Sequence, residues 1–128
     1  MFSLKRADKG NNPAIKEFPA AAATYKVGDA LVLTNGTVSK ASGTTKPTHV
    51  AAGAGTLAAN DILAVNPIYA DMEFVTTLSA AGTALKKGDK VTIAETADAV
   101  TATTTNGVAT IVEIIDPAAG GKVVVKFI

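Results

Sequence analysis

Two aspartates at matching positions have the types and spacing that could do chemistry. Asp29 and Asp89 follow Gly28 and Gly88, and each stands at the entrance to an apolar stretch. A pair of carboxylates can bind a cation or act as general acid and base. The same residues also suit a tight turn, because glycine supplies unusual backbone angles and aspartate accepts hydrogen bonds from nearby amides. We favour the turn interpretation, since Lys-x-Gly-Asp carries little functional specificity.

Other polar residues give weaker indications of catalysis. His49 is the only histidine and cysteine is absent, so a zinc site within one chain lacks ligands. No serine stands in the Gly-x-Ser-x-Gly context of a nucleophile elbow. Gly53-Ala54-Gly55 and Gly120-Gly121 lack the Lys-Ser/Thr pair or helix of a phosphate loop. We expect no catalytic residue, metal site or cofactor and no enzymatic activity; the alternative is a hydrolase that uses His49.

Composition and charge argue against several classes of partner. The 128 residues suit one domain or two closely packed half-domains. A formal net charge of +1 gives no electrostatic basis for binding nucleic acid or an anionic membrane. No apolar run approaches the roughly 18 residues of a membrane span. We therefore expect a protein partner rather than nucleic acid or membrane.

The elements that must position these residues are short β-strands. Small and β-branched residues dominate, and Asn35-Gly36 and Asn106-Gly107 are strong hairpin signals. The expected fold class is all-β, a small β-barrel or sandwich. The strands are expected at residues 30–34, 37–41, 48–52, 62–65, 72–78, 90–94, 99–105, 108–115 and 122–128.

The Lys-x-Gly-Asp phrase belongs to a longer internal match. Residues 25–33 resemble residues 85–93, sixty positions later. We expect a single β domain at 20–128 that contains two pseudo-repeated units, 25–68 and 85–128, bridged by 69–84. With a two-residue insertion Val38 aligns with Val100, and residues 48–50 align with 110–112. The alternative is that any β-barrel repeats such turns, because turns need glycine and aspartate.

Residues 1–19 differ from the rest and are expected to form an extended N-terminal arm. They contain a cluster of charge, a Gly-Asn-Asn-Pro breaker and a second proline at position 19. Spaced apolar side chains in a polar segment suit ordering on a partner, although a frayed terminus is an equal alternative. The expected interface residues are Phe2, Leu4, Lys5, Arg6, Lys9, Ile15 and Phe18.

The combined pattern resembles a known family. Residues 20–33, from Ala20 through Tyr25-Lys26-Val27-Gly28-Asp29 to Leu33, and residues 41–48 are similar to small head proteins of tailed bacteriophages. The resemblance covers most of residues 19–128. It implies a capsid decoration, or cement, protein on the virion exterior, assembled in the cytoplasm of the bacterial host. Such proteins bind the major capsid protein, often as trimers, through an N-terminal arm.

The resemblance leads to an expected function, with one main alternative. We expect a structural virion protein that binds the outer surface of a phage capsid and stabilises it. The alternative is a small-barrel binding module or adhesin that recognises a carbohydrate or host-surface ligand. Glycan sites favour exposed aromatic rings, and the chain has only two tyrosines and four phenylalanines. The exposure of those six rings therefore bears on the choice.

Overall fold

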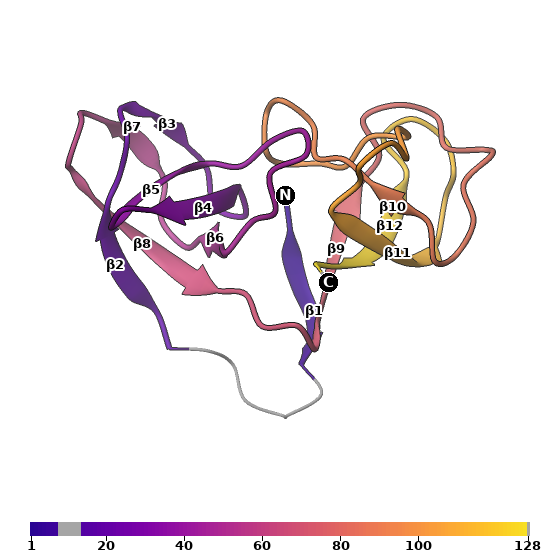
Figure 1. Ribbon diagram of the computed structural model, residues 1–128, viewed down its shortest axis with the longest axis horizontal. Coiled ribbons are helices and arrows are strands. Elements are labelled where there is room, and N and C mark those ends of the chain that lie inside the picture. The colour runs from indigo at the N-terminus through magenta and orange to yellow at the C-terminus, as the bar shows by residue number, and fades with distance from the viewer. Residues whose placement is uncertain (8–13, 128) are drawn as a thin grey trace.

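The structure is a computed structural model that describes residues 1–7 and 14–127. The described residues form β-sheets and contain no helix, so the all-β expectation is confirmed. Two five-stranded sheets lie side by side, and β1 (Ser3–Ala7), the edge strand of the second sheet, lies on the side nearer the first (Figure 1). The strands of each sheet pair antiparallel, and no sheet closes into a barrel. The arrangement is sandwich-like.

The first sheet is built from residues 16–67 in the order β2-β8-β6-β4-β5. The Asn35-Gly36 turn joins its last two strands as expected: both residues have positive φ, and Thr34 pairs with Thr37. A two-stranded sheet, β3-β7, lies at its outer end (Figure 1). The strands are β2 (Lys16–Pro19), β3 (Ala23–Tyr25), β4 (Ala30–Thr34), β5 (Thr37–Lys40), β6 (His49–Ala51), β7 (Gly55–Leu57) and β8 (Ile62–Pro67).

The second sheet has the order β1-β9-β12-β11-β10. One expected strand is wrong: of residues 99–105, only Val100 forms a bridge, to Leu78 and Ile93. Local threonine content favours a strand there, but no neighbouring strand supplies a longer ladder. The other strands are β9 (Met72–Thr77), β10 (Lys90–Val91), β11 (Ala109–Ile114) and β12 (Lys122–Lys126).

The pairings of the first sheet recur in the second. Ala30 faces Val50, and sixty positions later Lys90 faces Thr110. Ala51 faces Val65 and, again at +60, Ile111 faces Val125. The expected alignment of 48–50 with 110–112 is therefore displaced by two residues from this register. Val38 faces Leu33, and Val100 faces Ile93.

The buried side chains form two clusters. The smaller lies within the first sheet and consists of Ala20, Tyr25, Leu31, Val38, Ala51, Leu63 and Val65. The larger fills the second sheet and also takes in Ala30, Ala41 and Val50 from the first. The two sheets therefore share part of one core, and burial of apolar surface holds them together.

The described parts of the expected arm are strands of the chain's own sheets. β1 pairs with β9, from Ser3 opposite Val75 to Ala7 opposite Met72, with a bulge in between. β2 pairs with β8, from Lys16 opposite Val65 to Pro19 opposite Ile62. Residues 1–7 thus belong to the edge of one sheet and residues 16–19 to the edge of the other.

Candidate interaction surface

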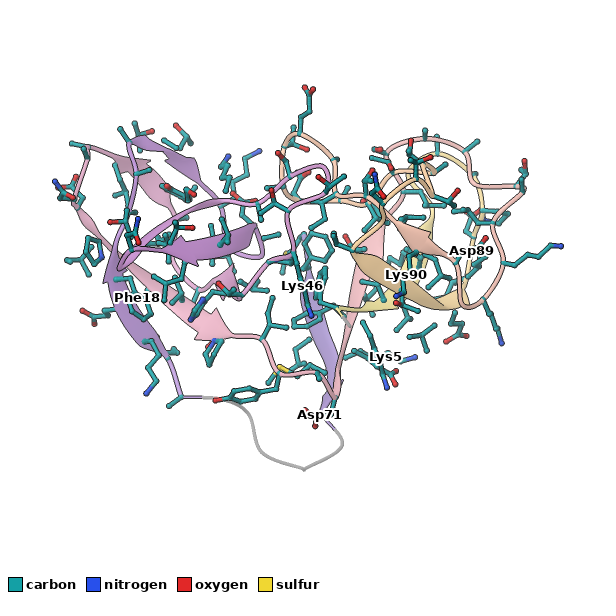
Figure 2. The ribbon with its side chains drawn as sticks, in the orientation of Figure 1. Lys5, Phe18, Lys46, Asp71, Asp89 and Lys90 are labelled. Carbon is teal, nitrogen blue, oxygen red and sulfur yellow. The ribbon has the colours of Figure 1, made fainter. Side chains whose placement is uncertain are left out.

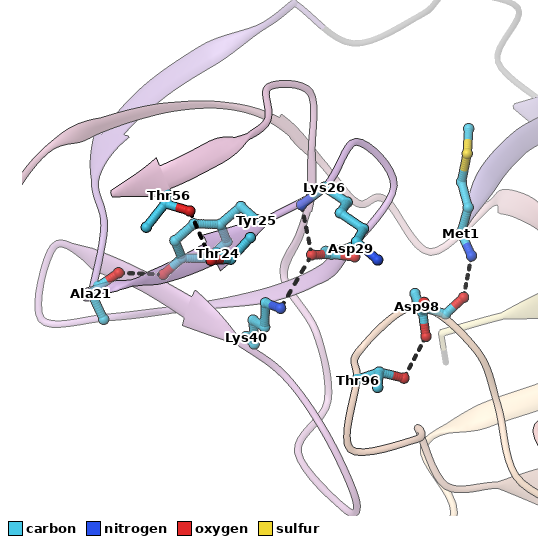
Figure 3. Close-up of polar contacts among 10 residues, drawn as sticks. All are labelled: Met1, Ala21, Thr24, Tyr25, Lys26, Asp29, Lys40, Thr56, Thr96 and Asp98. Carbon is cyan, nitrogen blue, oxygen red and sulfur yellow. Dashed lines mark hydrogen bonds and ion pairs between the residues drawn. The ribbon is translucent and has the colours of Figure 1, made fainter. Parts of the chain in front are cut away.

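The turn at Asp29 is held by its own carboxylate. Asp29 is buried, and one carboxylate oxygen accepts the backbone N–H of Lys26 at 2.9 Å (Figure 3). The same oxygen lies 3.6 Å from the Lys40 ammonium group, which offsets the cost of burying the charge. Gly28 has a φ of 90°, a backbone angle that residues other than glycine rarely adopt. The carboxylate is therefore used in local structure.

The turn at Asp89 repeats this geometry in the other sheet. Its carboxylate accepts the backbone N–H of Lys86 at 2.9 Å, and Gly88 also has a φ of 90°. Figure 2 shows Asp89 and Lys90 on the second sheet, far across the molecule from Phe18 on the first. Within residues 1–7 and 14–127, no three histidine, aspartate or glutamate side chains form a group that could hold a metal. The two aspartates serve separate turns.

Among the described residues, Tyr25 and His49 have altered pKa values, and both side chains are engaged in packing. Burial, and secondarily the Asp29 charge, raises the pKa of Tyr25, whose hydroxyl donates to the Ala21 carbonyl at 2.6 Å. Burial lowers the pKa of His49, whose ring packs edge-on against Phe18 with centroids 5.3 Å apart. His49 Nδ1 also lies 2.8 Å from the Thr48 hydroxyl. These contacts account for Tyr25 as part of the β3-β7 sheet and for His49 as part of the first sheet.

The seven expected interface residues fall into different environments. Phe2 is buried at 2% exposure and packs edge-on against Phe127, so its ring belongs to the core. Leu4 is exposed, and Lys5 forms an exposed ion pair of 3.3 Å with Glu113. The other four are Arg6, described only as a backbone partner of Glu73; Lys9, outside the described residues; Ile15, exposed; and Phe18, half-buried.

An open, largely apolar groove of about 610 Å³ lies beside β1, where the two sheets meet. It brings together three of the expected residues: Phe2, which directly precedes β1, Leu4 near the start of β1, and Ile15, which directly precedes β2. The rest of the lining comes from Met1, Ser3, Val27, Gly28, Val50, Ala51, Ala52, Asn66, Pro67, Met72 and Phe74.

Large exposed apolar side chains concentrate at this groove. Among the described residues, seven large hydrophobic side chains are exposed, and four of them line it: Met1, Leu4, Ile15 and Val27. Ile15 is the most exposed of the seven, at 64%. Gathered apolar exposure of this kind marks an interaction site more often than scattered single residues do. The groove is therefore the candidate interaction surface.

Sequence reasoning missed part of this surface. Val27 occupies the variable position of the first Lys-x-Gly-Asp turn, where nothing local indicates whether it faces solvent or core. Its neighbour is the N-terminus: the Phe2 N–H donates to the Gly28 carbonyl at 2.8 Å, and the Met1 amino group contacts the Asp98 carbonyl. The fold brings residues 1–4 to residues 27–28, a proximity that no local pattern encodes.

The aromatic side chains leave little for glycan stacking. Phe2, Tyr25, Phe74 and Phe127 are buried, and Phe18 is half-buried. Tyr69 is the exposed one of the six, at 52%. Carbohydrate sites are usually built on exposed rings. Under the adhesin alternative, Tyr69 would be the one exposed ring that could stack on a sugar.

The chain matches no known protein family model, and a search of curated proteins finds no relative. The described part of the chain contains no helix that is long and apolar enough to cross a membrane. The case for a function thus depends on the groove, on the distribution of ionisable groups and on the resemblance in the sequence.

Proposed function

We propose that this protein is a structural virion protein that binds the outer surface of a phage capsid and stabilises it. The observation that carries the proposal is the groove, where four exposed apolar side chains gather beside β1. A partner that covers them removes apolar surface from water, which favours binding. The partner we propose is the major capsid protein, and the site of action is the exterior of the capsid after assembly in the host cytoplasm.

The body of the molecule suits a scaffold that presents this surface. We propose that its two sheets are two copies of one unit, which the recurring turns and registers support. Each buried residue of the smaller cluster has a counterpart in or packed against the larger one, such as Leu63 with Val123 and Val65 with Val125. The proposed units are 16–67 and 74–127, and they include β2, which the sequence assigned to the arm.

The arrangement of ionisable groups supports a binding role over catalysis. A catalytic site needs titratable groups that converge on one place. Here the buried Asp29 accepts the Lys26 N–H and pairs with Lys40, and the buried Glu73 lies 4.0 Å from Lys126. A protein present in many copies on a lattice gains from avidity if it also forms an oligomer, for which we propose a trimer on the basis of the resemblance.

The groove can be tested with one substitution and a matched control. Ile15→Ser removes the most exposed apolar side chain of the groove, whereas Ile115→Ser removes one of 55% exposure that does not line it. We expect Ile15→Ser to weaken binding about tenfold, the loss expected when a well-buried isoleucine contact disappears. Ile115→Ser should bind as the parent does. The measurement is co-sedimentation with emptied phage heads.

Two outcomes would overturn the proposal. The first is failure of the parent protein to co-sediment with those heads. The second is equal binding by the parent and Ile15→Ser, which would move the contact away from the groove. Both substitutions replace exposed side chains, so neither should change the free energy of unfolding by more than about 0.5 kcal/mol.

A further inference from the structure

The outer edge of β2 is open to another strand at residues 15–17, whereas just past its end Ala20 bridges Val38 of β5 and the Ala21 N–H donates to the Val38 carbonyl. β2 ends the first sheet, and Lys16, Glu17 and the preceding Ile15 are exposed. Pro19 has no N–H, so its pair with Ile62 is one that exchanges no hydrogen bonds across the ladder. Because the pattern alternates, Phe18 and Lys16 bond to β8, and the backbone groups of Glu17 and Ile15 point away from the sheet.

The second sheet shows what such an edge accepts. β9 occupies the place there that β2 occupies in the first: Phe18 faces Leu63, and Thr76 faces Val123. This correspondence places Glu17 with Val75 and Ile15 with Glu73. The outer edge of β9 carries β1, through pairs at Val75 and Glu73. The edge of β2 thus has the backbone geometry to pair with a further strand. Among residues 1–7 and 14–127, no strand of its sheet pairs with that edge.

The side chains at the two edges differ, and the difference explains where β1 binds. β1 carries Lys5 beside Glu113 and Arg6 in register with Glu73. At the corresponding places of the first sheet stand Gly53 and Ile15, neither of which is acidic. The Lys5–Glu113 ion pair joins β1 to β11 of the second sheet, and Gly53 in the first sheet offers no acidic counterpart for it. The edge of β2 is therefore suited to a segment of another composition.

A second copy of β2 places like charges opposite each other when the pair is centred on either charged residue. In an antiparallel self-pair, residues whose backbone groups point outward must face each other. Centring the pair on residue 16 places Lys16 opposite Lys16, and centring it on residue 17 places Glu17 opposite Glu17. Like charges directly opposite each other destabilise a strand pair. These two registers of self-association are therefore disfavoured, whereas a complementary strand pairs both charges.

We propose that the outer edge of β2 binds an extended antiparallel segment of a partner protein carrying a basic, an acidic and an apolar side chain in that N-to-C order. The basic residue faces Glu17, the acidic residue faces Lys16 and the apolar residue faces Ile15. Since Ile15 also lines the groove, the apolar side chain of the segment lies at its margin. The segment gains main-chain hydrogen bonds from the edge and selectivity from the two charges. The proposal holds whatever the larger partner is.

A peptide titration of the full chain tests this edge. The probe is a capped heptapeptide, rich in threonine, whose central residues are lysine, glutamate and isoleucine in that order. We expect amide resonances of residues 15–17 to shift on titration in NMR spectra. A control peptide with lysine and glutamate exchanged should bind about threefold to tenfold more weakly, since both cross-strand charge pairs are reversed. Methylating the backbone nitrogen of the peptide's lysine should abolish the shifts, because that N–H faces Glu17 in the ladder.

Exchanging the charges of Lys16 and Glu17 tests the proposed pairing without disturbing the fold. The double variant Lys16→Glu with Glu17→Lys alters two exposed side chains and should unfold as the parent does. It should prefer the exchanged peptide by the same factor by which the parent prefers the probe. Equal binding of the two peptides, shifts at another edge such as β5 or β10, or no binding would each overturn the proposal.

Discussion

Gly28 and Gly88 share a backbone angle but differ in their surroundings. Both have a φ of 90° and sit before an aspartate that accepts a backbone N–H three residues earlier. A Cβ on Gly28 would collide with the Met1 side chain and come within 3.2 Å of the Phe2 nitrogen. A Cβ on Gly88 would have nothing within 4 Å. The absence of a side chain at Gly28 therefore also allows Met1 and Phe2 to pack closely against this turn.

Substituting alanine at the two glycines separates these tasks. Gly88→Ala should cost about 1 kcal/mol, from the strained backbone angle alone. Gly28→Ala should cost at least about 1 kcal/mol more, because the N-terminus must also shift. The measurement is urea unfolding of both variants, with amide exchange at Phe2 as a second readout. Equal losses of stability with unchanged exchange at Phe2 would contradict the prediction.

At the scale of elements, the sequence predicts strands where local pattern and pairing agree. Residues 30–34 and 37–40 alternate around an Asn-Gly turn and form β4 and β5 close to the expected bounds. β1 and β2 were missed because their strand conformation comes from pairing with β9 and β8, up to about 70 residues away. The turn aspartates could be interpreted locally, whereas the groove could not, because it joins segments distant in the sequence.

The N-terminal strand is expected to be part of the stable fold. Phe2 is 2% exposed and packs against Phe127, with ring centroids 5.4 Å apart, whereas Leu4 is 38% exposed. Phe2→Ala should cost about 3 kcal/mol of unfolding free energy, since it leaves a cavity in the shared core. Leu4→Ala, on the same strand, should cost less than about 1 kcal/mol. Chemical denaturation compares the two.

The same measurement decides between a strand and an arm. If residues 1–7 act as a dispensable arm, Phe2→Ala will unfold at the same denaturant concentration as the parent. Deletion of residues 1–19 should then leave the body unchanged as well. Under the strand interpretation the deletion lowers stability, because it removes the Phe2 ring and the edge strands of both sheets.

On the scale of the whole molecule, the two sheets are neither independent nor fully merged. The smaller cluster belongs to the first sheet, while the larger takes Ala30, Ala41 and Val50 from that sheet into the core of the second. A chain of 128 residues divided in this way can open one sheet while the other stays closed. The first sheet is the candidate for local opening, because its own cluster is smaller and one edge of β2 is unpaired in the described residues.

Leu63 and Val123 occupy corresponding places and test this division. Both are buried, at 3% and 0% exposure, one in each cluster. Leu63→Ala should cost about 2–4 kcal/mol and should speed native-state amide exchange mainly in β4, β6 and β8. Val123→Ala should speed exchange in both sheets, because loss of the shared core releases the first sheet as well. If Leu63→Ala instead speeds exchange equally in β12, the molecule opens as a single unit, and the two sheets are one cooperative body.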